Sequence, residues 1–69
     1  MQTFTLEKFD FIELYKLLKI MQLASSGGEA KQLIDEGLVK LNGEVETQRR
    51  KKVRKEDLVE FNGQSVKVD

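Results

Sequence analysis

Two Asn-Gly dipeptides in the second half of the chain constrain the fold more than any other feature of the sequence. An Asn-Gly pair between alternating apolar residues is the strongest short-range signal for a β-hairpin, because the turn needs positive φ at both positions. Asn42-Gly43 and Asn62-Gly63 each have such flanks. The sequence therefore predicts one hairpin over residues 39–46 and another over residues 58–68.

The first half of the chain has the apolar spacing of helices after a short opening strand near residues 3–6. Asp10, with Glu13 three positions later, suits the N-cap of a helix over about residues 11–21. Phe9 and Leu14 stand where a hydrophobic staple closes over such a cap. We therefore expect the first helix to begin directly after Asp10.

A second helix is expected from Ser26 to about Glu36. Ser26 and Glu29 have the Ser-x-x-Glu spacing of a capping box, and Gly37 suits the left-handed residue just past a helix end. The fold class that follows is α+β, with two short antiparallel helices packed on a small antiparallel sheet.

Length and composition indicate one domain over residues 1–69 that is held together by packing alone. The chain contains no Cys and no His, so neither a disulfide nor the usual zinc ligands are present. We expect no metal, no cofactor and no enzymatic activity, because no nucleophile has an evident base beside it. No apolar run approaches the ~20 residues of a membrane span, and we expect a cytoplasmic protein.

The charges are distributed unevenly, although the 12 basic and 12 acidic residues cancel. Residues 48–55 hold six basic side chains and no acid, whereas residues 25–47 and 56–69 are acidic. A charge run is often a solvated, mobile stretch. Val53 within the run and strand patterns on both sides favour a tethered segment, which would present a phosphate-binding surface.

Gly27 and Gly28 occupy the first turn of the second predicted helix, where each costs roughly 1 kcal/mol relative to alanine. One interpretation is an anion site, since bare backbone N–H groups at a helix N-terminus can approach a phosphate closely. Lys31 falls on the same face and would add a charge. The other interpretation is that the glycines only allow a tight turn or close helix packing.

The basic run contains no aromatic residue, and the Phe and Tyr side chains all fall at positions expected to face the core. Stacking of bases on an aromatic platform is therefore not expected. Recognition of the shape and backbone of paired or folded RNA fits better. DNA is a less suitable partner, because no helix with polar base-reading residues is evident.

Three stretches of the chain resemble the αL-motif domain, an RNA-binding module named after the fourth small-subunit ribosomal protein. They are Ser26-Gly27-Gly28-Glu29-Ala30-Lys31-Gln32-Leu33-Ile34, then Gly37-Leu38-Val39-Lys40-Leu41-Asn42-Gly43, and Val53 to Val59. The family pattern is Ser-Arg-x-x-Ala-x-x-x-Ile followed by Gly-x-Val-x-Val-Asn-Gly. The resemblance implies two helices and a strongly bent antiparallel sheet.

A closer similarity is to the short stand-alone members of that family, the YaaA/YbcJ group, which begin this helix with Ser/Thr-Gly-Gly-x-Ala-Lys. Gly27 stands where the broader family often has an RNA-contacting arginine. Arg50 replaces a glycine of the group, Gln48 replaces a base, and Lys55-Glu56 replaces its common Pro-Gly turn.

The resemblance implies a protein that binds structured RNA, such as ribosomal RNA or tRNA, with the helix start and the basic residues of the sheet. We expect it to act as a monomer. An adaptor that binds an acidic protein surface is the alternative. The expected contacts are Gly27, Gly28, Lys31, Lys40, Arg49, Arg50, Lys51, Lys52, Arg54 and Lys55.

Overall fold

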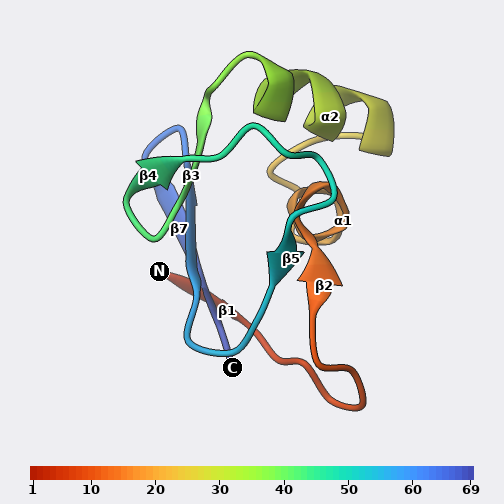
Figure 1. The fold of residues 1–69 in the computed structure, drawn as a ribbon, viewed down its shortest axis with the longest axis vertical. Coiled ribbons are helices and arrows are strands. Elements are labelled where there is room, and N and C mark those ends of the chain that lie inside the picture. The colour runs from red at the N-terminus through yellow and green to blue at the C-terminus, as the bar shows by residue number, and fades with distance from the viewer.

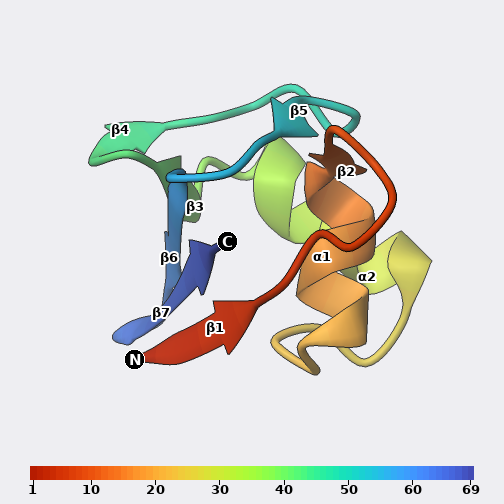
Figure 2. The same cartoon turned by 90° about the horizontal axis from the view of Figure 1, so that it is seen from below.

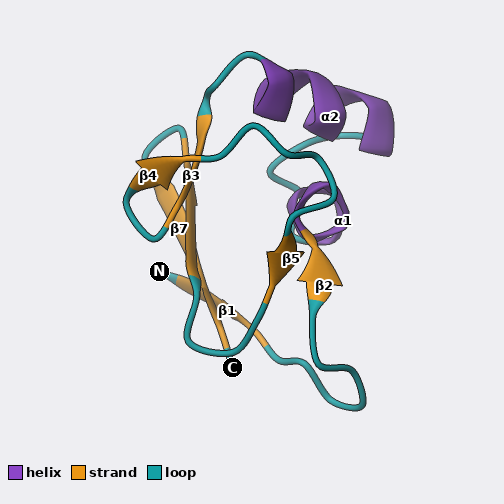
Figure 3. Ribbon diagram, viewed as in Figure 1, coloured by secondary structure: helices purple, strands orange, loops and turns teal.

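Two helices and seven short strands make up the computed structural model, which describes all residues, 1–69 (Figure 1). In chain order they are β1 (Gln2–Phe4), β2 (Ile12–Glu13), α1 (Leu14–Ile20), α2 (Gly27–Asp35), β3 (Val39–Leu41), β4 (Glu44–Val45), β5 (Lys52–Val53), β6 (Leu58–Phe61) and β7 (Gln64–Val68). The α+β fold class is confirmed. Figure 3 shows the helices gathered on one side and most strands on the other.

Both predicted hairpins are present in a five-stranded sheet of order β1-β7-β6-β3-β4. Asn42 and Asn62 have φ of 54° and 52°, and the glycine after each also has positive φ, as the turn prediction requires. Figure 2 shows the strands changing direction from β7 to β4, so that the sheet is strongly bent. The sheet is not wholly antiparallel, however, because β1 pairs with β7 in parallel.

The second helix begins and ends as the sequence predicts. The Ser26 hydroxyl accepts a hydrogen bond from the Glu29 N–H at 3.1 Å, and the Glu29 carboxylate accepts one from the Ser25 N–H at 2.8 Å. Gly37 has φ of 75° directly after the C-cap. Helices α1 and α2 pack on each other, and Figure 1 shows α1 end-on where α2 lies across the view. Their axes therefore cross steeply, and the expected antiparallel arrangement of the two helices is wrong.

The predicted start of the first helix is wrong. Residues Ile12 and Glu13 form strand β2, α1 begins at Leu14, and its N-cap, Glu13, makes no side-chain capping bond. Phe9 is 74% exposed and so does not close over Leu14. The reason is a long-range contact, since β2 pairs with β5 in a separate antiparallel ladder.

One apolar core joins the helices to both sheets. Leu14, Leu17 and Leu18 of α1 are fully buried, as are Ala30 and Ile34 of α2. Val53 of β5 is also fully buried, together with valines of the five-stranded sheet. Because Val53 lies inside this core, the charged residues on either side of it must project outward. Neither helix is long and apolar enough to cross a membrane.

Candidate functional site

Residues 48–55, here termed the basic segment, cross from the five-stranded sheet to the start of α1 (Figures 1 and 2). The Leu14 N–H donates to the Lys51 carbonyl at 2.9 Å, and the Tyr15 N–H donates to the Arg49 carbonyl at 3.1 Å. These carbonyls take the place of a side-chain cap for the first turn of α1. The prediction of a tethered segment is confirmed, because its backbone is bonded to α1 and Val53 is buried.

Five of the six cations in the basic segment lie exposed without an ion pair. The ion pairs of the structure involve Lys16, Arg49 and Lys67 only. The charges of the five unpaired cations are therefore available to an anionic partner at short range, within a Debye length of roughly 8 Å at physiological salt. The five unpaired cations are Arg50, Lys51, Lys52, Arg54 and Lys55.

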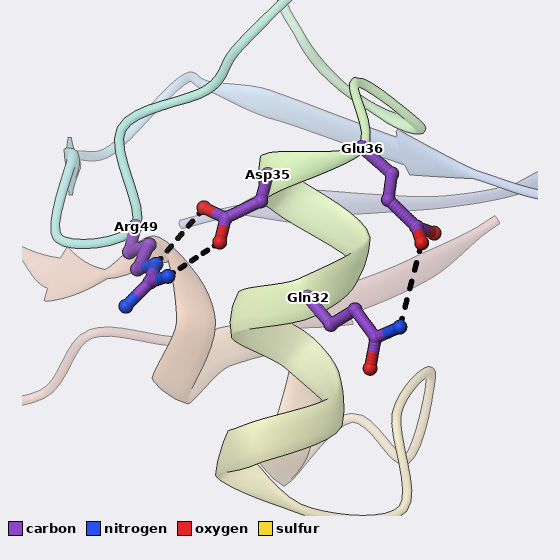
Figure 4. Close-up of polar contacts among 4 residues, drawn as sticks. All are labelled: Gln32, Asp35, Glu36 and Arg49. Atoms are coloured by element: carbon purple, nitrogen blue, oxygen red, sulfur yellow. Dashed lines mark hydrogen bonds and ion pairs between the residues drawn. The ribbon is translucent and has the colours of Figure 1, made fainter.

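Arg49 is the exception, because its guanidinium is held by Asp35 at the end of α2 (Figure 4). Nε donates to Oδ1 at 2.9 Å, and a second guanidinium nitrogen donates to Oδ2. This hydrogen bonding lowers the pKa of Asp35; desolvation opposes the shift, and the positive charge of Arg49 adds to it. Figure 4 also shows the Gln32–Glu36 contact of α2, which does not involve the segment. Arg49 thus fastens the basic segment to α2.

Tyr15 brings the start of α2 next to the basic segment. The Lys31 ammonium lies 4.7 Å from the centre of the Tyr15 ring, and a Cβ built on Gly27 would lie 3.9 Å from the same ring. The Tyr15 backbone bonds to the segment, as described above. Lys31 and Gly27 therefore lie on one side of Tyr15, whose backbone is bonded to the segment.

Neither tight turn geometry nor close packing accounts for the two glycines. Gly27 and Gly28 are absent from the residues with positive φ. A Cβ at either position would approach other atoms no closer than 3.9 Å, which is an ordinary contact. The N–H groups of a first helical turn have no intrahelical partner, so the anion-site interpretation stays as a prediction.

Lys40 lies apart from the ladder that carries the basic segment. It is exposed in the middle of β3, and its partner in β6 is Glu60. Strand β3 belongs to the five-stranded sheet, whereas β5 of the basic segment pairs with β2 in a separate ladder. The structure therefore does not join Lys40 to the other predicted contacts.

The expectation that every aromatic side chain faces the core is wrong for Phe9 and Phe11, which are 74% and 36% exposed. Phe11 lies beside the basic segment, with the Lys52 ammonium 5.0 Å and the Arg54 guanidinium carbon 5.9 Å from the ring centre. Sequence reasoning missed this neighbour because only the pairing of β2 with β5 brings the two stretches together. No group of three or more Asp and Glu side chains is placed to hold a metal ion.

Comparison with known proteins gives the same family across nearly the whole chain. The S4 domain matches residues 4–69. YbcJ of Escherichia coli (strain K12) is 46% identical over 68 residues, which cover 99% of this chain and 97% of YbcJ. YbcJ of Shigella flexneri matches to the same extent.

Solved structures that are similar to this one include a full-length relative and a domain of a larger ribosomal protein. The solution structure of E. coli YbcJ, described as revealing an αL motif involved in RNA binding, has a TM-score of 0.75 and covers 99% of this chain and 86% of that one. The 30S ribosomal protein S4e of Thermoplasma acidophilum is 27% identical with a TM-score of 0.69, over 84% of this chain and 31% of its own. From the match over residues 4–69 and the 46% identity to YbcJ, we conclude that this chain belongs to the S4 domain family.

Proposed function

We propose that this protein is a non-catalytic RNA-binding protein that holds the phosphate backbone of a structured RNA on its basic segment. The observation that carries the proposal is the set of five exposed, unpaired cations on a segment anchored to α1 and β2. The αL motif involved in RNA binding in the similar YbcJ structure supports RNA as the partner.

Backbone recognition follows from the kinds of side chain on this surface. Lys and Arg contact phosphate oxygens without reading sequence, so they fix the position of the RNA rather than its bases. Lys31 and the N–H groups of Gly27 and Gly28 extend the surface across Tyr15. Arg49 acts mainly as a positioning residue, because Asp35 already neutralises it.

The partner we propose is a folded RNA with paired regions, such as ribosomal RNA or tRNA, bound by a single copy of the chain in the cytoplasm. A-form RNA offers phosphates and 2′-hydroxyls across a wide minor groove, which a compact cationic surface can contact without base readout. The chain has no His and no Cys, and no Ser or Thr in it has an evident base beside it, which supports a binding role over catalysis.

The test replaces Arg50, Lys51, Lys52 and Arg54 with Gln and measures binding to a fluorescent tRNA by anisotropy. All four side chains are exposed, so the variant should unfold in urea as the parent does. We expect most of the affinity to be lost, and the slope of log K against log salt to flatten by about 0.7–0.9 for each phosphate contact removed.

A matched control replaces three exposed or half-exposed lysines outside the segment, Lys8, Lys19 and Lys67, with Gln. This variant should keep most of its affinity although it loses similar charge. Equal losses in the two variants would contradict the proposal. A protein partner whose capture survives nuclease treatment, with RNA affinity unchanged, would favour the adaptor function instead.

A further inference from the structure

The ladder formed by β2 and β5 has one face in the core and one face in solvent. Ile12 pairs with Val53, and Glu13 pairs with Lys52. Because Val53 is fully buried and side chains alternate along a strand, Lys52 and Arg54 project outward. One step beyond the paired residues, the same register sets Phe11 opposite Arg54. Phe11, Lys52 and Arg54 therefore share the outward face.

This outward face combines an accessible aromatic ring with two cations. The cation-to-ring distances of 5.0 Å and 5.9 Å lie within the range of cation–π attraction, which is weak at exposed sites. Neither cation forms an ion pair, and Glu13, which lies opposite Lys52 in the ladder, is paired with Lys16 instead. An aromatic ring next to a cationic strand is the arrangement on which proteins stack unpaired bases while holding the adjoining phosphates.

The surface beyond Phe11 limits what can lie on it. Phe11 lines an open groove with the exposed Phe9 and Ile20. The charged residues of the lining are mixed, with three acids (Glu7, Asp10 and Glu13) and three lysines (Lys8, Lys16 and Lys52). Acids and lysines balance in this lining, and Lys16 is paired with Glu13, so the groove itself has no net attraction for a phosphate. A neutral base can lie over its apolar side chains. A nucleotide bound here would therefore place its base toward the groove and its phosphate toward Lys52 and Arg54.

We propose that Phe11 is a stacking platform for one unpaired nucleotide of the bound RNA, so that the protein prefers a paired RNA interrupted by an unpaired base. The proposal rests on the proposed function, which supplies the RNA, and adds the class of RNA feature that is recognised. Base stacking on an aromatic side chain is sequence-tolerant, so the preference concerns an unpaired base of any identity.

The experiment compares a blunt, fully paired RNA duplex with the same duplex carrying one unpaired adenosine. The wild type should bind the bulged duplex at least about fivefold more tightly, from the usual strength of base–aromatic stacking. Phe11→Leu should lose this preference but keep the affinity for the paired duplex, whereas Phe11→Tyr should retain both. Val45→Ala is the matched control, because Val45 is an exposed apolar residue of β4 that does not line this groove.

A second readout uses the absence of tryptophan from the chain, which makes Phe11→Trp a single-site fluorescent reporter. Its emission should be quenched by the bulged duplex and not by the paired one. The proposal would be overturned if the wild type showed no preference for the bulged duplex, or if Phe11→Leu kept that preference. Equal quenching of the Phe11→Trp emission by polyglutamate would also overturn it. If instead the segment variant described above still bound the paired duplex, the proposed function itself would fail, which is a separate result.

Discussion

At the scale of single residues, neighbours in the sequence have different surroundings in the structure. Arg49 is bonded through two guanidinium nitrogens to Asp35, whereas Arg50 is exposed without an ion pair. A cation that is already neutralised releases fewer counterions from RNA than a free one. The identity of the residues could not predict this difference, because Asp35 and Arg49 are brought together only by the packing of the segment on α2.

The first prediction compares Arg49→Ala with Arg50→Ala in tRNA binding over a range of salt concentrations. Arg50→Ala should flatten the slope of log K against log salt by about 0.7–0.9, the value for one phosphate contact. Arg49→Ala should flatten it by clearly less. The control is Asp35→Asn, which frees Arg49 and should steepen the slope. Equal slopes for the two arginine variants would show that Asp35 does not neutralise Arg49.

Glu56 has a left-handed backbone conformation, which is unfavourable for any residue that has a side chain. Its φ is 78°, in the turn where the Arg54 N–H bonds to the Asp57 carboxylate at 2.8 Å. A non-glycine residue in the left-handed region costs about 1–2 kcal/mol. Asn42 has a similar φ of 54°, but its side-chain oxygen accepts from the Leu58 N–H and its amide donates to Asp57.

The second prediction follows from this contrast. Glu56→Gly should raise the free energy of unfolding by about 0.5–1 kcal/mol, since relief of the strain exceeds the entropy cost of glycine. Asn42→Gly should lower it by about 1–2 kcal/mol, because two side-chain hydrogen bonds are lost. Urea unfolding measures both. A destabilised Glu56→Gly would show that the Glu56 side chain contributes more than its backbone strain costs.

At the scale of elements, the sequence predicted correctly the elements that are specified by residues close together in the chain, and it failed where distant residues decide. Helix α2 and both hairpins are specified locally, by Ser26 with Glu29, by Gly37 and by the two Asn-Gly turns. The start of α1 is specified at long range, because its first N–H groups bond to the carbonyls of Arg49 and Lys51. Residues 11–13 have apolar spacing that suits a helix, and only pairing with β5 makes them a strand.

The third prediction tests which residues cap the two helices. Ser26→Ala should cost about 1 kcal/mol of unfolding free energy, the usual value for a lost N-cap bond. Asp10→Ala should change it by less than about 0.5 kcal/mol, as for an exposed residue without a special contact, because Asp10 does not cap α1. The measurement is again urea unfolding. If Asp10→Ala lowered the unfolding free energy by a similar amount, Asp10 would be the N-cap of α1, as the sequence suggested.

At the scale of the whole molecule, a net charge of zero conceals one cationic face. The clustering of six bases in residues 48–55 is visible in the sequence, and so is the glycine-rich helix start. The fold determines three further features of the site. It places the helix start near the basic segment through Tyr15, pairs Arg49 with Asp35, and sets Phe11 beside Lys52. The sequence therefore predicts the charge of the candidate site but not which charges are free or which ring accompanies them.

The central claim is that one face of the molecule, centred on the basic segment, binds structured RNA. The most direct measurement is nuclear magnetic resonance mapping of the ¹⁵N-labelled protein with unlabelled tRNA at several salt concentrations. We predict the largest shift changes at residues 50–55, Phe11, Tyr15 and Lys31, decreasing as salt rises, with the turns at 42–43 and 62–63 unaffected. Changes centred on those turns, or no changes at low salt, would contradict the account.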